Sequence, residues 1–175
     1  MRYIALLRGV NVGGKNMIKM ETLREMVASL GFSNVKTYVN SGNVAFDAKK
    51  ASDTTIAKKI HDAIDKELGM DISVMVRSAD EIKKIISKNP YDGQFENDKY
   101  LHIFFLNEEL SKEDRDRLLA NNSDVEFISI DGRTIYYMLK ISILDSVLGK
   151  GFIDKKLKIP STARNWRTVN KVAEL

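Results

Sequence analysis

Apolar residues recur along the chain with two spacings: short runs of three to six residues, and stripes in which they fall every three or four residues. In the first 77 residues the runs indicate strands and the stripes indicate amphipathic helices. The expected strands are residues 2–8, 35–39, 44–46 and 72–76. The expected helices carry the stripes that begin at Leu23 and Ile56, and Gly31 and Gly69 end them. This order, βαββαβ, is that of a ferredoxin-like unit.

The second half repeats most of this order. Ser78 and Glu81 predict a capping box in front of a helix, and a polar loop follows at residues 89–99. The expected strands are residues 101–106, 125–130 and 134–139, the last two joined by a hairpin turn at Asp131-Gly132. The expected helices are one capped by Ser111 and Asp114, a short one near residues 142–148, and one over residues 162–174 capped by Ser161 or Thr162. No closing strand is evident, and residues 157–159 are the only candidate.

The pattern predicts an α+β fold of two duplicated ferredoxin-like subdomains, βαββα(β), plus a C-terminal helix. The expected divisions are residues 1–77 for the first subdomain, 78–100 for a connecting helix and loop, and 101–175 for the second subdomain with its basic C-terminal helix. The repeat lies in the order of the elements and not in residue identity.

Composition narrows the class of protein. Apolar residues make up 43% of the 175, and there is no cysteine, which excludes disulfides, thiolate nucleophiles and cysteine-ligated metals. No apolar run approaches the roughly 20 residues of a membrane span, so we expect a cytoplasmic protein with no membrane partner. Residues 1–40 and 149–175 are basic (six Lys/Arg against two Asp/Glu, and seven against two), whereas the middle is acidic. Basic ends suit an anionic ligand or nucleic acid, or are simply solvated.

The stretch RGVNVGGKN, residues 8–16, has the spacing G-x-x-x-x-G-K of a phosphate-binding P-loop. Three features argue against a nucleoside triphosphatase. Asn16 replaces the Ser or Thr that would hold magnesium, the helical stripe starts several residues after Lys15, and the next two strands form a hairpin. A glycine loop of this kind still suits an anion, because Gly13 and Gly14 permit a nest of backbone N–H groups. The alternative is that these glycines only let the connection turn.

Topology places this loop beside the turn Asn40-Ser41-Gly42-Asn43. In a ferredoxin-like sheet the first strand ends where the second ends and the third begins. We therefore predict an anion site at this edge, for a phosphate-bearing small molecule or nucleic acid. The residues assigned to it are Arg8, Asn11, Gly13, Gly14, Lys15, Asn40, Ser41, Asn43, Arg164 and Asn165. An ordinary hairpin turn explains the Asn-Ser-Gly-Asn segment equally simply.

RGVNVGGKN, YVNSGNVAF and the later TARNW together resemble the bacterial proteins of domain-of-unknown-function family 1697, with the motifs in the same order. The resemblance runs from residue 2 to about residue 173. It implies a compact α+β protein with duplicated ferredoxin-like subdomains, and it implies no established activity, substrate or catalytic residue. It also implies that Arg164 and Asn165 belong with the other two motifs.

Other chemistry is sparse. His61 and His102 have no companions at metal-ligand spacing and suit structural roles. No general acid/base pair and no nucleophile motif is present, so no catalytic residue, metal or cofactor is predicted. Strands lacking paired aromatics do not support base stacking of RNA. Two other hypotheses stay open: a scaffold in which Arg164 and Asn165 cap or bridge loops, and an enzyme whose residues the sequence does not pair.

Overall fold

The computed structural model describes residues 1–175. Contacts group the chain into two compact units, residues 1–84 with 171–175 (unit 1) and residues 85–170 (unit 2). Each unit contains one four-stranded antiparallel sheet, with the strand order β2-β3-β1-β4 in unit 1 and β6-β7-β5-β8 in unit 2. The chain is therefore an α+β protein, and each sheet places its third strand beside its first.

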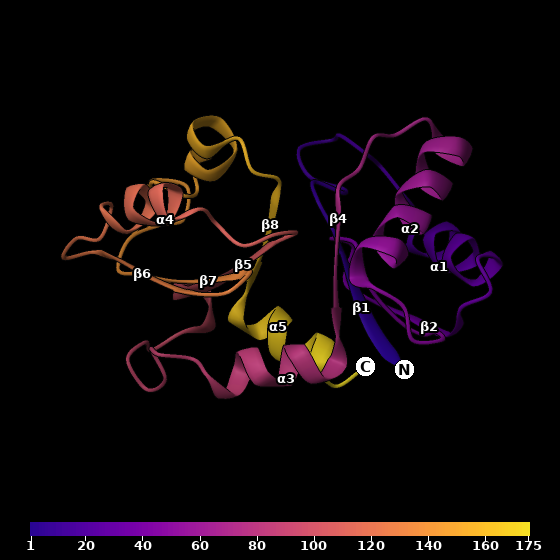
Figure 1. Ribbon diagram of the computed structural model, residues 1–175, viewed down its shortest axis with the longest axis horizontal. Helices are drawn as coiled ribbons and strands as arrows, with labels where there is room; N and C mark the ends of the chain where they lie inside the picture. Colours follow the sequence, from indigo (N-terminus) through magenta and orange to yellow (C-terminus); the bar gives the residue numbers. More distant parts are fainter. The chain divides into compact units, whose positions relative to one another are not determined.

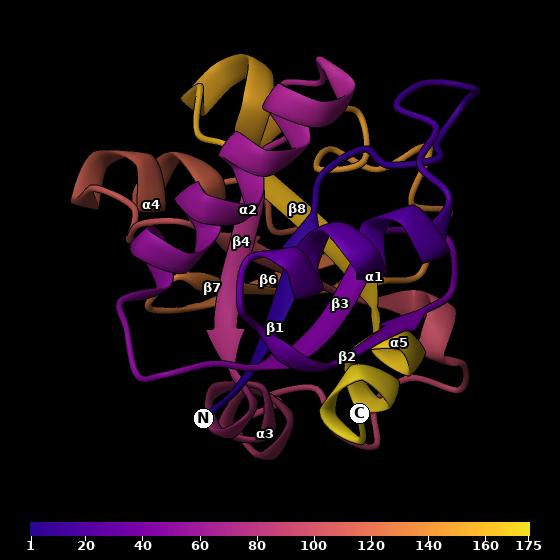
Figure 2. The same ribbon diagram turned by 90° about the vertical axis from the view of Figure 1, so that its right-hand side faces the viewer.

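Unit 1 has two helices on one face of its sheet, as Figures 1 and 2 show. In chain order the elements are β1 (Arg2–Leu7), α1 (Met20–Ser29), β2 (Ser33–Tyr38), β3 (Asn43–Asp47), α2 (Asp53–Leu68), β4 (Val74–Ser78) and α3 (Ala79–Ser87), the last continuing into unit 2. The core lies between sheet and helices. It contains Leu23 and Val27 of α1 and Ile56, Ile60 and Ile64 of α2, all at most 1% exposed.

The helix boundaries of unit 1 follow local signals in the sequence. Gly69 adopts the left-handed conformation (φ 63°) and caps the C-terminus of α2. The N-cap of α2 is Ser52, because its hydroxyl accepts the amide of Thr55 (3.1 Å). The capping box in front of α3 is confirmed: the Ser78 hydroxyl accepts the Glu81 amide at 3.2 Å, and the Glu81 carboxylate accepts the Ser78 amide at 2.8 Å.

Unit 2 repeats the strand order of unit 1, but different elements cover its sheet. Its elements are the 3-10 turn η1 (Asp98–Tyr100), β5 (Leu101–Leu106), α4 (Lys112–Leu119), β6 (Glu126–Asp131), β7 (Thr134–Leu139), the π-helical turn η2 (Ile153–Leu157), β8 (Ser161–Asn165) and α5 (Trp166–Ala173), whose end from residue 171 onward belongs to unit 1. One face of the sheet packs on Leu118 of α4 and on Leu148, Ile153 and Leu157. The segment between β7 and β8 thus covers the sheet where unit 1 uses α2.

Three expectations for unit 2 were wrong. Residues 142–148 form turns and not a helix, because the Ser146 hydroxyl bonds the Ile143 carbonyl (2.7 Å) and the Gly149 amide (3.1 Å). Residues 157–159 are not the closing strand. That strand is β8, so the last helix begins at Trp166, four residues later than predicted. β8 pairs with β5 along its whole length, and this long-range ladder overrides the helical pattern of the segment.

The outer edge of β6 is covered by side chains. Asn122 donates to the Ile128 carbonyl (3.4 Å) and accepts the Ile128 amide (2.7 Å). Arg115 donates to the Ile130 carbonyl (3.1 Å). Ser123 pairs with Glu126, its hydroxyl accepting the Glu126 amide (3.1 Å) and its own amide donating to the Glu126 carbonyl (2.9 Å). These backbone groups of Glu126, Ile128 and Ile130, which a further strand would use, are therefore bonded within the unit.

Candidate functional site

The glycine-rich stretch forms a small β-hairpin that extends from the end of β1. Val12 and Lys15 form an antiparallel bridge, and the Lys15 amide donates to the Val12 carbonyl (3.0 Å). Gly13 and Gly14 make the turn with φ of 58° and 72°. Two successive positive φ values are what a tight two-residue hairpin turn requires. The spacing of a P-loop is thus met by a hairpin, and α1 begins only at Met20.

Asn11 fastens this hairpin to its surroundings. Its side-chain amide donates to the carbonyls of Ile18 (2.9 Å) and Asn40 (2.7 Å), and its Oδ1 accepts the Ile18 amide (2.8 Å). Its own φ is 55°, a conformation that Asn tolerates better than most residues. One side chain therefore links the glycine hairpin, the turn after β2 and the approach to α1. Because both N–H groups and the oxygen are bonded internally, Asn11 positions the site and does not point to a ligand.

The turn between β2 and β3 is packed tightly against the hairpin. The Leu7 amide donates to the Gly42 carbonyl at 2.9 Å. A Cβ on Gly42 would lie 2.8 Å from the Leu7 Cβ and 3.3 Å from the Val10 Cβ, and Gly42 also has φ of 73°. Asn43 is fully buried and donates to the Tyr38 carbonyl (3.0 Å) and the Ser41 hydroxyl (2.9 Å). The turn is held by its own side chains.

The expected convergence of these segments is present in unit 1. Asn43 pairs with Leu6 of β1 and with Tyr38 of β2, so the end of β1, the end of β2 and the start of β3 meet at one end of the sheet. The predicted residues that lie there are Arg8, Asn11, Gly13, Gly14, Lys15, Asn40, Ser41 and Asn43. The remaining two, Arg164 and Asn165, belong to β8 of unit 2.

A pocket of about 680 Å³ opens beside the hairpin. Its lining residues are Asn11, Met17, Ile18, Lys19, Met20, Glu21 and Asn40. They include the first turn of α1, whose N-cap, Lys19, makes no side-chain capping bond. Helix N-termini present unpaired N–H groups and a partial positive charge. Lys19 adds a positive charge, Glu21 adds a negative one, and Met17 (63% exposed) adds apolar surface. Sequence reasoning missed Lys19 and Glu21, because it placed the site on the glycines.

Arg164 and Asn165 have structural contacts within unit 2. Arg164 is 7% exposed, and its Nη1 donates to the Ala163 carbonyl (2.7 Å) and the Thr162 hydroxyl (2.8 Å). Burial lowers the pKa of Arg164 to about 10, so the group stays cationic at neutral pH. The Asn165 Oδ1 accepts the Thr168 amide (2.9 Å), which makes it the capping side chain of α5.

Unit 1 contains a counterpart of Arg164 that sequence reasoning missed. Arg77 on β4 is 2% exposed, and its Nη1 donates to the preceding carbonyl, that of Val76 (2.8 Å), as Arg164 donates to the carbonyl before it. Arg77 pairs with the third residue of β1, and Arg164 pairs with the third residue of β5. Each arginine is followed at once by a helix-capping residue. The shared signal in the sequence is an arginine between a strand and an N-cap.

The two histidines each contact a main-chain carbonyl. His61 Nδ1 lies 3.0 Å from the Ile72 oxygen, and His102 Nε2 lies 2.9 Å from the Lys99 oxygen. Since a carbonyl only accepts, these nitrogens carry the hydrogen. The structure contains no group of three His, Asp or Glu side chains placed to hold a metal ion. None of its helices combines the length and the apolar character that crossing a membrane requires.

The fold and this edge define an α+β protein with two antiparallel sheets of equal strand order and a glycine hairpin at the end of the first strand. A family model described as a protein of unknown function, DUF1697, matches residues 1–136, and the chain belongs to this family. The match includes the two motifs of unit 1, whereas residues 162–166 lie beyond it.

A solved structure has the same fold. It is that of the conserved bacterial protein SP0830 from Streptococcus pneumoniae, at 24% sequence identity and a TM-score of 0.76, covering 99% of this chain and 97% of that chain. No curated protein matches the chain.

Proposed function

We propose that unit 1 binds a phosphate-bearing ligand at the glycine-loop edge. The observation that supports this most directly is the N-terminus of α1, which has no side-chain cap and lines a pocket of about 680 Å³ together with Lys19. Helix N-termini of this kind bind phosphate and carboxylate groups through N–H donors and the helix dipole. The anion would lie against the amides of the first turn, and Lys15 and Lys19 would supply the charge.

The remaining walls narrow the class of ligand. Met17, Ile18 and Met20 offer apolar surface, and Glu21 places a carboxylate on the wall. A carboxylate opposes a densely charged polyanion. These walls favour a small phosphate monoester with an apolar part over nucleic acid. The binding of such a molecule in the cytoplasm is consistent with a chain that has no cysteine.

We also propose that the two units are duplicated ferredoxin-like subdomains. Both sheets have the order second-third-first-fourth, with the strands of each unit counted along the chain. The buried arginines Arg77 and Arg164 occupy equivalent positions and are followed by the capping residues Ser78 and Asn165. A repeated residue at a repeated register supports common descent more than element order alone.

The phosphate proposal is tested by NMR titration of the protein with phenyl phosphate, inorganic phosphate and phenol. We expect phenyl phosphate to bind more tightly than either fragment and to shift the amides of Met20 and Glu21. Lys19→Ala should weaken binding about threefold, the usual scale of one exposed charge pair. Glu21→Gln should strengthen binding by a similar factor, since it removes a repulsive charge.

The matched control is Lys49→Ala. Lys49 is exposed and follows β3, at the opposite end of the same sheet from the glycine loop. It removes the same charge and should leave phenyl phosphate binding unchanged. If all variants bind alike, general charge attraction explains the titration and the proposed site is wrong. If no phosphate binds and Lys15→Ala or Lys19→Ala lowers the melting temperature sharply, the edge is a scaffold. A steep salt dependence of oligonucleotide binding would point to nucleic acid.

A further inference from the structure

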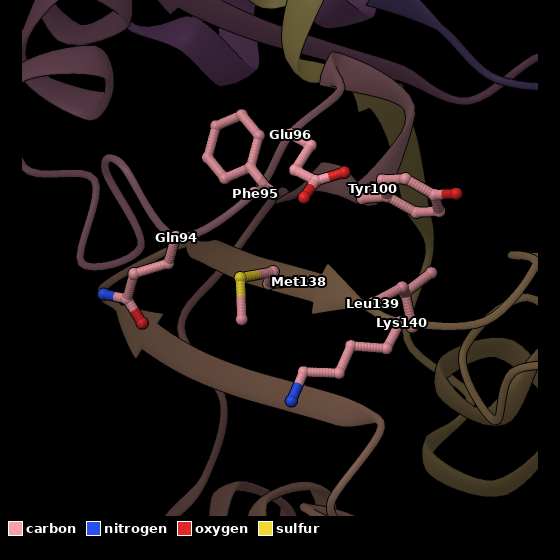
Figure 3. Close-up of a pocket in the computed structure, with 7 residues that line it drawn as sticks. All are labelled: Gln94, Phe95, Glu96, Tyr100, Met138, Leu139 and Lys140. Carbon is pink, nitrogen blue, oxygen red and sulfur yellow. The ribbon is translucent and has the colours of Figure 1, made fainter.

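Unit 2 contains a second pocket, distinct in chemistry from the first. It has a volume of about 280 Å³ and lies where the loop before β5 faces the end of β7 (Figure 3). Its lining residues are Gln94, Phe95, Glu96, Tyr100, Met138, Leu139 and Lys140. Ligand pockets usually measure about 300–1,000 Å³, so this one suits a small molecule.

The walls of this pocket are ordered by contacts within unit 2. Phe95 packs edge-on against Trp166, with ring centroids 6.4 Å apart and an interplanar angle of 81°. The Tyr100 amide donates to the Asn97 carbonyl at 2.9 Å. The floor is Met138, which is 5% exposed and pairs across the sheet with residues of β5 and β6. The aromatic wall and the floor therefore exist before any ligand arrives, which lowers the entropy lost on binding.

Two charges of opposite sign flank the floor. Figure 3 shows the Glu96 carboxylate beside the rings of Phe95 and Tyr100, and the Lys140 amine on the other side of Met138. Both side chains are exposed. Lys140 lies over the ring of Phe127, with Nζ 5.1 Å from its centroid, which fixes the direction of the amine. The pocket is thus apolar in the middle, acidic and aromatic on one side, and basic on the other.

We propose that this pocket binds a zwitterion of dipeptide size, with an apolar body and charged groups at its two ends. The ammonium group would lie against Glu96 and the ring of Phe95, because aromatic faces attract cations. The ring of Tyr100 already carries the amine of Lys99, 5.0 Å from its centroid, so Tyr100 serves as an apolar wall. The carboxylate would pair with Lys140, and the apolar side chains would cover Met138. The pocket volume of about 280 Å³ lies at the lower end of the range for ligand pockets, which favours a small molecule over a nucleotide or a large cofactor. This site is independent of the phosphate site, because all its residues belong to unit 2.

The experiment uses the single tryptophan as a reporter. Trp166 is the only tryptophan of the chain and contacts Phe95, which lines the pocket. We expect leucyl-leucine, which does not itself fluoresce, to change the Trp166 emission with a saturable curve. N-acetyl-leucyl-leucine and leucyl-leucine amide, which each lack one charge, should bind about three- to fivefold more weakly. Glu96→Gln should remove the discrimination against the acetylated form, and Lys140→Met the discrimination against the amide.

Lys49→Ala in unit 1 is the control, because Lys49 is exposed and lines neither pocket, and it should leave the leucyl-leucine curve unchanged. Both pocket substitutions replace exposed side chains, so the variants should fold, and their far-ultraviolet spectra check this. The proposal is overturned if leucyl-leucine gives no saturable change. It is equally overturned if either blocked form binds as well as the free dipeptide, since one of the two charges would then have no role. Failure here leaves the phosphate proposal unaffected, because phenyl phosphate is titrated separately.

Discussion

Substitution of Asn11 distinguishes most clearly between a residue that positions the site and one that contacts the ligand. Asn11→Gly keeps the freedom to adopt its φ of 55° and removes the three hydrogen bonds to Ile18 and Asn40. A typical intramolecular hydrogen bond contributes about 1 kcal/mol net. Because Asn11 is only half-buried, we take about 2 kcal/mol for the three together. Asn11→Ala should destabilise the fold by roughly 1 kcal/mol more than Asn11→Gly, since the left-handed conformation is unfavourable for alanine.

Thermal unfolding followed by circular dichroism measures these changes. For a chain of this size, about 2 kcal/mol lowers the melting temperature by roughly 4–8 °C. Asn16→Gly is the matched control. It also replaces an Asn with positive φ (47°), but one with a single side-chain bond, to the Gly9 carbonyl at 3.2 Å. The reasoning is refuted if Asn11→Gly is as stable as wild type and nevertheless loses phenyl phosphate binding, because Asn11 would then contact the ligand directly.

Further predictions concern glycines and acid stability. Gly42→Ala should cost about 2 kcal/mol or more in a urea titration, because its Cβ would lie 2.8 Å from that of Leu7 at a positive φ; Gly→Ala at an unstrained glycine would instead stabilise. Gly149→Ala should cost more, because its Cβ would overlap the Ile143 carbonyl oxygen; near-native stability would contradict the turn geometry. Burial lowers the pKa of His102 from its ordinary value of 6.5, so its contribution to stability is present above pH 6.5 and is lost as the pH falls through the folded-state pKa. His102→Gln should therefore reduce the dependence of the unfolding free energy on pH in this range. An unchanged dependence would mean that other groups cause the loss of stability in acid.

Local signals in the sequence predicted most of the fold. The strand Leu101–Leu106 is observed with its predicted bounds, and the capping box of Ser78 and Glu81 is present. These features depend on residues close in the chain. The closing strand β8 was missed because its ladder with β5 joins residues about 60 apart, and the pattern of its five residues fits helix as well as strand. The spacing of hydrophobic residues does not show which distant strand a segment pairs with.

For the candidate site, too, some features were predictable from the sequence and others were not. Strand order alone placed the glycine loop beside the turn that contains Asn43, and the pairing of Asn43 with both β1 and β2 confirms this neighbourhood. The direction of each side chain was not predictable. Asn11 turns inward to bond the backbone, whereas Lys19 and Glu21 line the pocket. Residue type indicates which bonds a side chain is able to make, and only packing decides which of them it makes.

The covered edge of β6 bears on how the protein behaves when it is abundant. An open strand edge is a template for joining identical chains into fibrils or for exchanging strands between neighbours. Asn122, Arg115 and Ser123 occupy the positions that such a neighbour would use. We therefore expect the bonds of Asn122 to disfavour strand pairing between copies of the chain at this edge, whatever ligand the protein binds.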